Sequence, residues 1–382
     1  MNDRLTWIPN LMDKNFRAPF RFDEDKEYLE KLETLYDRFI KKIKQLSNDF
    51  NYKVIEDYKD RILNIVPDYY NGRIIDSITK VKELIKDVGN NDFAKSTLRN
   101  CEAFLGNKNY ELQFFRARVS KEYLDYPANK MLHIPFRERY KTNNQRFSMP
   151  GYPCLYVANT SYACWIELDK PSEHDFYVSP IIFDGKQKVL NLAVSIENFT
   201  RLHDFEKERS TTWLKLIMLM FATSFVYVGD VKNRNFKVEY IIPQLIMQAC
   251  LNLNYDGIVY NSTKVCSDKF SFAAINLVLF AKPKKTQDNN SSEAIDKYAE
   301  ICNHIKIADA YNYQLFKQIC KNEDWKNYEL RVLNTGITTK IGSYDRQFNY
   351  SNTNFCDFDK FLFSTWKNKD SLDFGHITNN QV

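Results

Sequence analysis

The sequence predicts an α+β protein, in which a helical N-terminal bundle is followed by a domain with a mixed β-sheet. Two observations predict it. Apolar residues recur at helical spacing through residues 22–50, and helical stretches follow at about 52–66, 73–88 and 92–105. From Glu111 onward, short apolar runs rich in β-branched and aromatic residues indicate strands with helices between them.

The predicted strands and helices after Glu111 alternate over short connections. Strands are expected at residues 112–119, 154–158, 176–183, 188–192, 257–260 and 272–280, and helices at 160–168, 209–224 and 241–252. Thr160 or Ser161 can cap the first of these helices. Pro243 suits the first turn of the last one.

The chain is long enough for two or three domains. We expect a helical domain over 1–105, a domain with a mixed sheet over 106–283, and a linker with a C-terminal extension over 284–382. The polar, charged run Pro283–Ser292 has the composition of a linker. One helix is expected at about 293–321, and the aromatic, Asn-rich sequence after it has no predicted structure.

Composition points to the cytoplasm. The formal net charge is +5 with acidic and basic residues interleaved, so nothing requires a nucleic-acid partner. The eight cysteines form no C-x-x-C pair and no zinc-spaced cluster, so we expect reduced thiols and no metal. Met1–Arg21 is polar, which predicts no cleavable signal. The longest apolar run, Trp213–Val228, is too short to predict a membrane span.

Common catalytic motifs are absent from the sequence, including phosphate loops, dinucleotide-binding glycine motifs, zinc-protease motifs and nucleophile elbows. Polar residues at the edges of predicted elements remain as candidates: Arg116, Arg118, Arg146, Tyr156, Glu167 and Ser262. A strand arginine is usually solvated or ion-paired. A glutamate near a helix C-terminus is usually solvated too, although the helix dipole disfavours it there. For His133 a structural role is the favoured interpretation.

Two stretches, residues 131–168 and 239–264, resemble the longer members of the RES-domain family. That family is named after an Arg, a Glu and a Ser, and its members are known as toxins of toxin–antitoxin pairs. The resemblance covers about 170 residues in order. It implies a fold similar to ADP-ribosylating toxins and the consumption of NAD⁺ as substrate.

The family's functional residues fall on five positions of this sequence. Its two arginines match Arg116, in FFRARVS, and Arg146, in NNQRFSMPG. Its tyrosine, glutamate and serine match Tyr156, Glu167 and Ser262. Phe115 stands where a Tyr is common, which removes one hydroxyl.

The resemblance implies a role for each matched residue. Arg116 and Arg146 would bind the pyrophosphate of NAD⁺, because a guanidinium offers a planar fork of donors. Tyr156 would pack against the nicotinamide or its ribose, and Ser262 would hydrogen-bond a ribose hydroxyl or the carboxamide. Glu167 would stabilise the positive charge that develops as the nicotinamide–ribose bond breaks, with Arg116 and Tyr156 beside it.

Several alternatives stay open. The resemblance implies transfer to water or phosphate, by a toxin-like glycohydrolase or phosphorylase that degrades NAD⁺. The alternative is an ADP-ribosyltransferase that modifies a specific protein. A catalytically silent nucleotide-binding regulator is another option. An RNA-processing role for the N-terminal bundle is disfavoured, because residues 1–105 contain no His. The resemblance implies a helix-turn-helix antitoxin as partner, and the sequence leaves open whether the chain forms a homodimer.

Overall fold

The computed structural model describes residues 14–46, 51–89, 94–101, 112–122, 126–194, 207–230, 234–265, 274–282, 304–319, 330, 340–343 and 346–367. The protein is α+β. It divides into two compact units that are each discontinuous in sequence. The first unit comprises Met1–Ser96, Gln145–Phe147 and Lys188–Asp268, and the second comprises Thr97–Asn144, Ser148–Gln187 and Lys269–Val382. The domain boundaries expected at residues 105 and 283 stay predictions.

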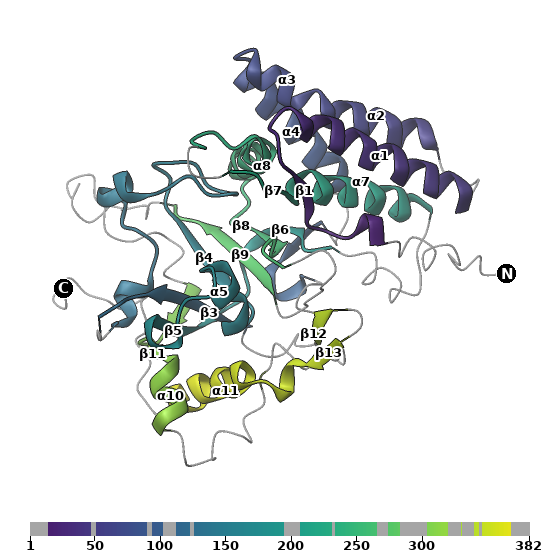
Figure 1. Ribbon diagram of the computed structural model, residues 1–382. Helices are drawn as coiled ribbons and strands as arrows, with labels where there is room; N and C mark the ends of the chain where they lie inside the picture. The colour runs from purple at the N-terminus through teal and green to yellow at the C-terminus, as the bar shows by residue number, and fades with distance from the viewer. Residues whose placement is uncertain are drawn as a thin grey trace. The chain divides into compact units, whose positions relative to one another are not determined.

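The first unit is mainly a helical bundle (Figure 1). Its α-helices are α1 (Glu27–Leu46), α2 (Tyr52–Leu63), α3 (Ile65–Tyr70), α4 (Ile74–Gly89), α7 (Lys207–Thr223) and α8 (Ile241–Asn252). α1 buries the apolar stripe that predicted it, which includes Tyr28, Leu32, Tyr36 and Phe39.

Helix α7 is the core of this bundle, since nearly every side chain from Trp213 to Thr223 is buried. Two buried tyrosines of α1 tie it in place. The Tyr28 hydroxyl donates to the carbonyl of Ala222 at 3.0 Å, and the Tyr36 hydroxyl donates to that of Met218 at 2.8 Å. A buried hydroxyl needs such a partner, so each tyrosine fixes the position of α1 as well as filling the core.

The strands of the first unit form two small groups. β1 (Phe20–Phe22) pairs in parallel with β7 (Phe225–Tyr227). β6 (Lys188–Leu192) pairs in parallel with β8 (Gly257–Asn261), and β2 (Lys95–Thr97) follows β6 in the strand order.

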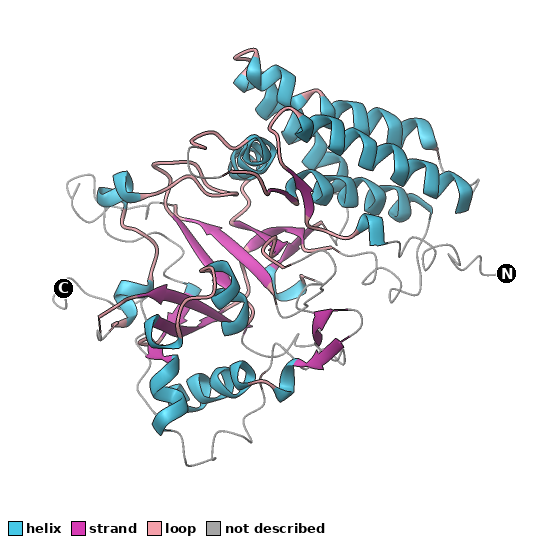
Figure 2. Cartoon of the chain, viewed as in Figure 1, coloured by secondary structure: helices cyan, strands magenta, loops and turns pink. Residues whose placement is uncertain are grey.

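The second unit is built on an antiparallel sheet, drawn among the magenta strands of Figure 2. Its strands run in the order β10 (Ile305–Ile307), β5 (Phe176–Phe183), β3 (Leu112–Val119), β4 (Cys154–Ala158) and β9 (Ile275–Phe280). β11 (Tyr311–Asn312) also pairs with β5. The C-terminal region therefore contributes two strands at the β5 edge of this sheet.

Helices and turns complete the two units. In the second unit the α-helices are α5 (Ser161–Glu167), α10 (Tyr313–Ile319) and α11 (Asn354–Lys367), with the hairpin β12 (Lys340–Ser343) and β13 (Arg346–Asn349). The 3₁₀ turns among the described residues are Lys14–Phe16, Leu98–Asn100, Ala128–Met131, Phe136–Lys141, Glu173–Asp175, Val238–Tyr240 and Tyr350–Asn352.

Most predicted elements are confirmed, and two helices are wrong. The helix expected at 92–105 is strand β2 followed by a 3₁₀ turn, because backbone pairing prevails over a weak helical pattern there. The helix expected at 293–321 is wrong over residues 305–312, where β10 and β11 pair with β5, and is confirmed over the short helix α10. The predicted linker Pro283–Ser292 lies outside the described residues.

Thr160 caps α5 as predicted, accepting from the backbone N–H of Ala163 at 3.0 Å. Pro243 lies in the first turn of α8 as predicted. Within the described ranges, every helix is too short or too polar to cross a membrane.

Candidate functional site

Strands β3 and β4 diverge at the position of Arg116. β3 pairs with β5 along its eight residues, and β4 pairs with β9 along its five. Between β3 and β4 the described register has a single pair, Phe115 with Ala158. Arg116 Nη1 donates to the backbone carbonyl of Tyr156 at 2.8 Å. The guanidinium of a β3 residue thus binds a backbone carbonyl of β4, next to the single residue pair that joins the two strands.

Glu167 is the last residue of α5, and its carboxylate is held from the sheet. The Asn276 side-chain amide on β9 donates to Glu167 Oε1 at 2.6 Å. Asn276 is buried and pairs with Ala158, which in turn pairs with Phe115. Asn276, which orients Glu167, therefore lies in register with Ala158 and Phe115. These two residues are the pair that joins β4 to β3.

Sequence reasoning missed Asn276. The signal was present: an Asn stands inside the apolar run Ile275–Phe280, where strands rarely carry one. A buried amide in such a strand needs hydrogen-bond partners, so it marks a position with a polar task. Only the tertiary structure identifies that partner as Glu167.

Helix α5 is anchored at its beginning by the C-terminal helix α11. The buried carboxylate of Asp359 accepts from the backbone N–H of Ser161 at 3.2 Å and from the Tyr350 hydroxyl at 2.7 Å. Burial raises the pKa of Asp359 to about 7, although both hydrogen bonds lower it. The C-terminal region thus helps to position the helix that carries Glu167.

The charges of Arg116 and Glu167 both affect the pKa of one buried thiol, that of Cys164. Burial, and then the charge of Asp359, raise the pKa of Cys164 well above its usual value; Arg116 lowers it and Glu167 raises it. Cys164 also donates to the Phe115 carbonyl, with Sγ 3.4 Å from the oxygen. These interactions place Arg116 and Glu167 in one neighbourhood around Cys164.

Arg116 remains a cation at neutral pH. Burial, followed by the charge of Arg118, lowers its pKa to about 9. Tyr156 presents its hydroxyl to Ser148, donating to Oγ at 2.9 Å. Since Arg116 binds the Tyr156 backbone, these two predicted site residues are in direct contact in the second unit.

Arg146 belongs to the first unit, together with its two neighbours Gln145 and Phe147. Its Nη1 donates to the carbonyl of Thr223 at 2.9 Å and its Nη2 donates to that of Phe225 at 3.0 Å. The guanidinium also lies 5.1 Å from the centroid of the Tyr240 ring. Arg146 therefore ties the end of α7 to β7, and both terminal nitrogens have protein partners.

Ser262 also belongs to the first unit, where it follows β8. It is buried, and its Oγ accepts from the backbone N–H of Lys264 at 3.2 Å. The structure therefore brings Arg116, Tyr156 and Glu167 together within the second unit. Arg146 and Ser262 have their described contacts in the first unit, so a site of all five residues stays a prediction.

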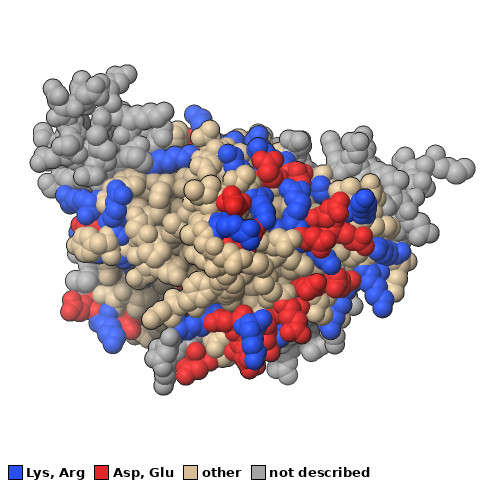
Figure 3. All heavy atoms as spheres, turned by 90° about the horizontal axis from the view of Figure 1, so that it is seen from above, with Lys and Arg blue, Asp and Glu red and all other residues tan. Residues whose placement is uncertain are grey.

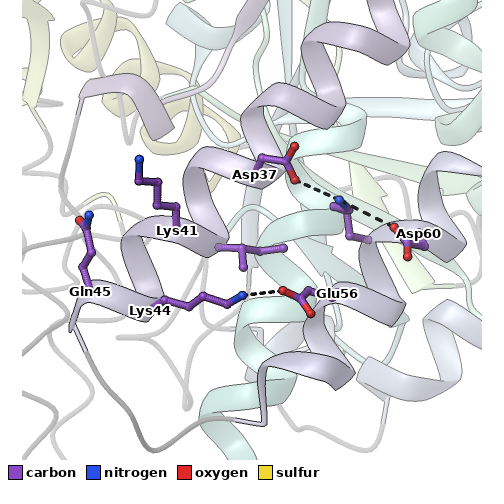
Figure 4. Close-up of a pocket in the computed structure, with 8 residues that line it drawn as sticks. Asp37, Lys41, Lys44, Gln45, Glu56 and Asp60 are labelled. Atoms are coloured by element: carbon purple, nitrogen blue, oxygen red, sulfur yellow. Dashed lines mark hydrogen bonds and ion pairs between the residues drawn. The ribbon is translucent and has the colours of Figure 1, made fainter.

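A pocket of about 650 Å³ lies elsewhere, along α1 and α2 of the first unit. Its charged residues are largely paired with one another (Figure 4): Lys44 with Glu56 at 2.6 Å, and Lys59 with Asp37 at 3.0 Å. Basic and acidic side chains are similarly interspersed on the face in Figure 3. Such a pattern is typical of solvated helical faces, so this pocket is not our candidate site.

No group of three or more His, Cys, Asp or Glu side chains is placed to hold a metal ion within the residues that the structure describes. The candidate groups near Arg116 are one half-buried cation, one oriented carboxylate and one phenol. Such a set suits the binding of an anionic ligand and the stabilisation of a nearby positive charge.

Comparison with known proteins identifies one family. The model of the RES domain matches residues 114–296. A Bacillus subtilis (strain 168) protein named "Putative toxin YopC" is 27% identical over 253 residues, or 61% of this chain and 55% of YopC. The match thus spans about half the length of that relative. A chain of the M. tuberculosis MbcT–MbcA toxin–antitoxin complex aligns over 63% of this chain and 97% of its own, at 10% identity and a TM-score of 0.28.

Proposed function

Residues 114–296 form a RES domain, and on that basis we propose that this chain is an enzyme that cleaves the nicotinamide–ribose bond of NAD⁺. The observation that carries the proposal is the oriented carboxylate of Glu167. It is fixed by Asn276 and shares the neighbourhood of Cys164 with the cation Arg116. A catalytic domain over residues 106–283 is part of the proposal.

The proposed reaction needs few protein groups. The bond between the ribose anomeric carbon and the pyridinium nitrogen breaks, and its electron pair stays on nitrogen, so nicotinamide leaves neutral without an acid. The ribose acquires oxocarbenium-like charge. Glu167 stabilises that charge, Arg116 binds the pyrophosphate, and Tyr156 packs against the nicotinamide or its ribose. Water or phosphate then bonds to the anomeric carbon and loses a proton.

A toxin-like role is part of the proposal. The name of YopC and the RES domain support it, and they also support an antitoxin as a partner that would cover the site. Arg146 and Ser262 stay in the proposal as NAD⁺-binding residues. Two of the five N–H donors of Arg146 bind backbone carbonyls, so its proposed contact with NAD⁺ would use the N–H groups that remain.

The experiment is to incubate the full chain with NAD⁺, with and without inorganic phosphate, and to identify the products by mass. We expect nicotinamide with ADP-ribose, or with its 1-phosphate when phosphate is the acceptor. Glu167→Gln keeps the shape of the side chain and removes the charge. It should slow the reaction about 10²–10³-fold, because one electrostatic stabiliser is worth roughly 3–4 kcal/mol of barrier.

The matched control is Glu173→Gln. Glu173 is a glutamate of the same unit, on the surface, where it pairs with Lys317 at 2.8 Å. This variant should consume NAD⁺ at the wild-type rate. Full activity in Glu167→Gln would refute the assigned role of Glu167. ADP-ribose attached to a protein, with little released in free form, would favour an ADP-ribosyltransferase instead.

A further inference from the structure

Three buried nitrogen atoms near the start of the RES domain lack a hydrogen-bond partner among the residues that the structure describes. They are Arg116 Nε, Arg118 Nε and His133 Nε2. His133 is 4% exposed. Buried polar atoms almost always find a partner in a folded protein, so three such atoms in one region call for an explanation.

The three residues form one cluster. Arg116 and Arg118 are two positions apart on β3, so both side chains lie on the same face of the strand. Arg118 Nη2 donates to the carbonyl of Leu132, the residue before His133, at 3.3 Å. The charge of Arg116 also contributes to lowering the pKa of His133, after burial. We refer to Arg116, Arg118 and His133 as the β3 cluster.

The two arginines of the β3 cluster have no ion-paired carboxylate among the described residues. Among the described residues neither Arg116 nor Arg118 takes part in an ion pair; both donate to backbone carbonyls. Each cation also lies close enough to the other for the charge of Arg118 to lower the pKa of Arg116. Two neighbouring, partly buried cations repel each other, and an anion bound between them would compensate their charge.

His133 adds a group suited to a phosphate. Its Nδ1 is 2.8 Å from the carbonyl of Ile134, so Nδ1 carries a proton. Nε2 then accepts from a hydroxyl of a protonated phosphate, or donates once the ring gains a second proton beside an anion. Two guanidinium groups supply the remaining donors and match up to two negative charges.

We propose that Arg118 and His133, together with Arg116, bind one phosphate group used in the reaction proposed above. The inference rests on that proposed function and adds two residues to it. Arg118 replaces Arg146 as the main partner of Arg116, because Nε of Arg118 has no partner among the described residues while both terminal nitrogens of Arg146 bind carbonyls. The phosphate is either inorganic phosphate, the acceptor, or part of the pyrophosphate of NAD⁺.

The first test is direct binding. Inorganic phosphate is titrated calorimetrically into the full chain without NAD⁺, and NAD⁺ is titrated into the Glu167→Gln variant. Arg118→Met and His133→Asn, made in each background, should weaken the binding of at least one ligand about tenfold or more, which is the scale of one charge-assisted hydrogen bond. Arg137→Met is the matched control, because Arg137 lies in the same segment with its side chain 54% exposed.

Steady-state kinetics identify the source of the phosphate. A raised KM for phosphate with an unchanged KM for NAD⁺ would assign the β3 cluster to the acceptor. A raised KM for NAD⁺ with an unchanged KM for phosphate would assign the β3 cluster to the pyrophosphate. Arg118→Lys keeps the positive charge but lacks the planar guanidinium, so it should lose less binding affinity than Arg118→Met. It replaces Arg118→Met if that variant does not fold.

The two proposals fail in different ways. If both cluster variants bind phosphate and NAD⁺ as tightly as Arg137→Met does, the β3 cluster is not a phosphate site, even if NAD⁺ is cleaved. If phosphate binding depends on the cluster but NAD⁺ stays intact, the anion site stands and the proposed reaction falls.

Discussion

Replacing Asp359 with an asparagine should change how the stability of this protein depends on pH. Asp359 is fully buried at the beginning of α5, and its pKa is raised from 3.8 to about 7. In the unfolded chain the carboxyl titrates near its ordinary value, so between pH 3.8 and 7 the folded state holds a proton that the unfolded state has lost. The free energy of unfolding therefore falls as the pH rises through this window.

The size of the effect follows from the shift. A pKa difference of about 3 units corresponds to about 4 kcal/mol over the whole window. Between pH 5.5 and pH 8, where other carboxylates change little, ionisation of Asp359 should cost about 2 kcal/mol of unfolding free energy. The amide introduced by Asp359→Asn cannot ionise, and its oxygen can still accept from the Ser161 N–H. This variant should therefore lose none of that free energy.

The assay is urea unfolding of the wild type and of Asp359→Asn at pH 5.5, 7 and 8. The difference between the two proteins isolates Asp359, because histidine titration is common to both. The free energy of unfolding of Asp359→Asn minus that of the wild type should increase by about 2 kcal/mol from pH 5.5 to pH 8. A difference that stays constant across these pH values would refute the reasoning.

Tyr350→Phe serves as the control for that experiment. It removes the hydroxyl that donates to Asp359 and stabilises its anion. The pKa of Asp359 should then rise further, so the pH at which stability stops falling should move upward and the total loss should grow. The same pH dependence in Tyr350→Phe and in the wild type would mean that this hydrogen bond does not control the titration.

Three further predictions concern hydrogen bonds of Asn276, Thr160 and Arg146. Asn276→Leu keeps the volume but removes the donor to Glu167, so kcat for NAD⁺ should fall about 10–100-fold with little change in melting temperature; an unchanged kcat would contradict the role of Asn276. Thr160→Ala removes the cap of α5 and should lower the free energy of unfolding by about 1 kcal/mol in urea, whereas Thr160→Ser should not. Arg146→Met leaves two carbonyls without their donor and should cost roughly 1–3 kcal/mol; equal stability by urea unfolding would show that they find other partners.

The sequence determined the local elements of this protein wherever the hydrophobic period was strong. α1, α5, α7 and α8 lie within a few residues of their predicted bounds, and so do the central strands β3, β4 and β5. The hydrophobic period did not predict the structure where pairing with a strand distant in the sequence determines it, as at β2 and β10. A strand of three residues is too short to show a period, and its partner lies far away in the sequence.

For the candidate site, too, the sequence predicts one part and only the tertiary structure shows the other. The motif resemblance nominated Arg116, Tyr156 and Glu167, because the order and types of residues are visible in one dimension. The tertiary structure alone decided which groups hold them: Asn276 for Glu167, a backbone carbonyl of β4 for Arg116, and Asp359 for α5. It also gave Arg146 backbone partners in the first unit, and it left one buried nitrogen of Arg118 and one of His133 without a partner among the described residues. The partner of Glu167 and the backbone partner of Asp359 lie more than a hundred positions away in the sequence, and no local pattern encodes such a pairing.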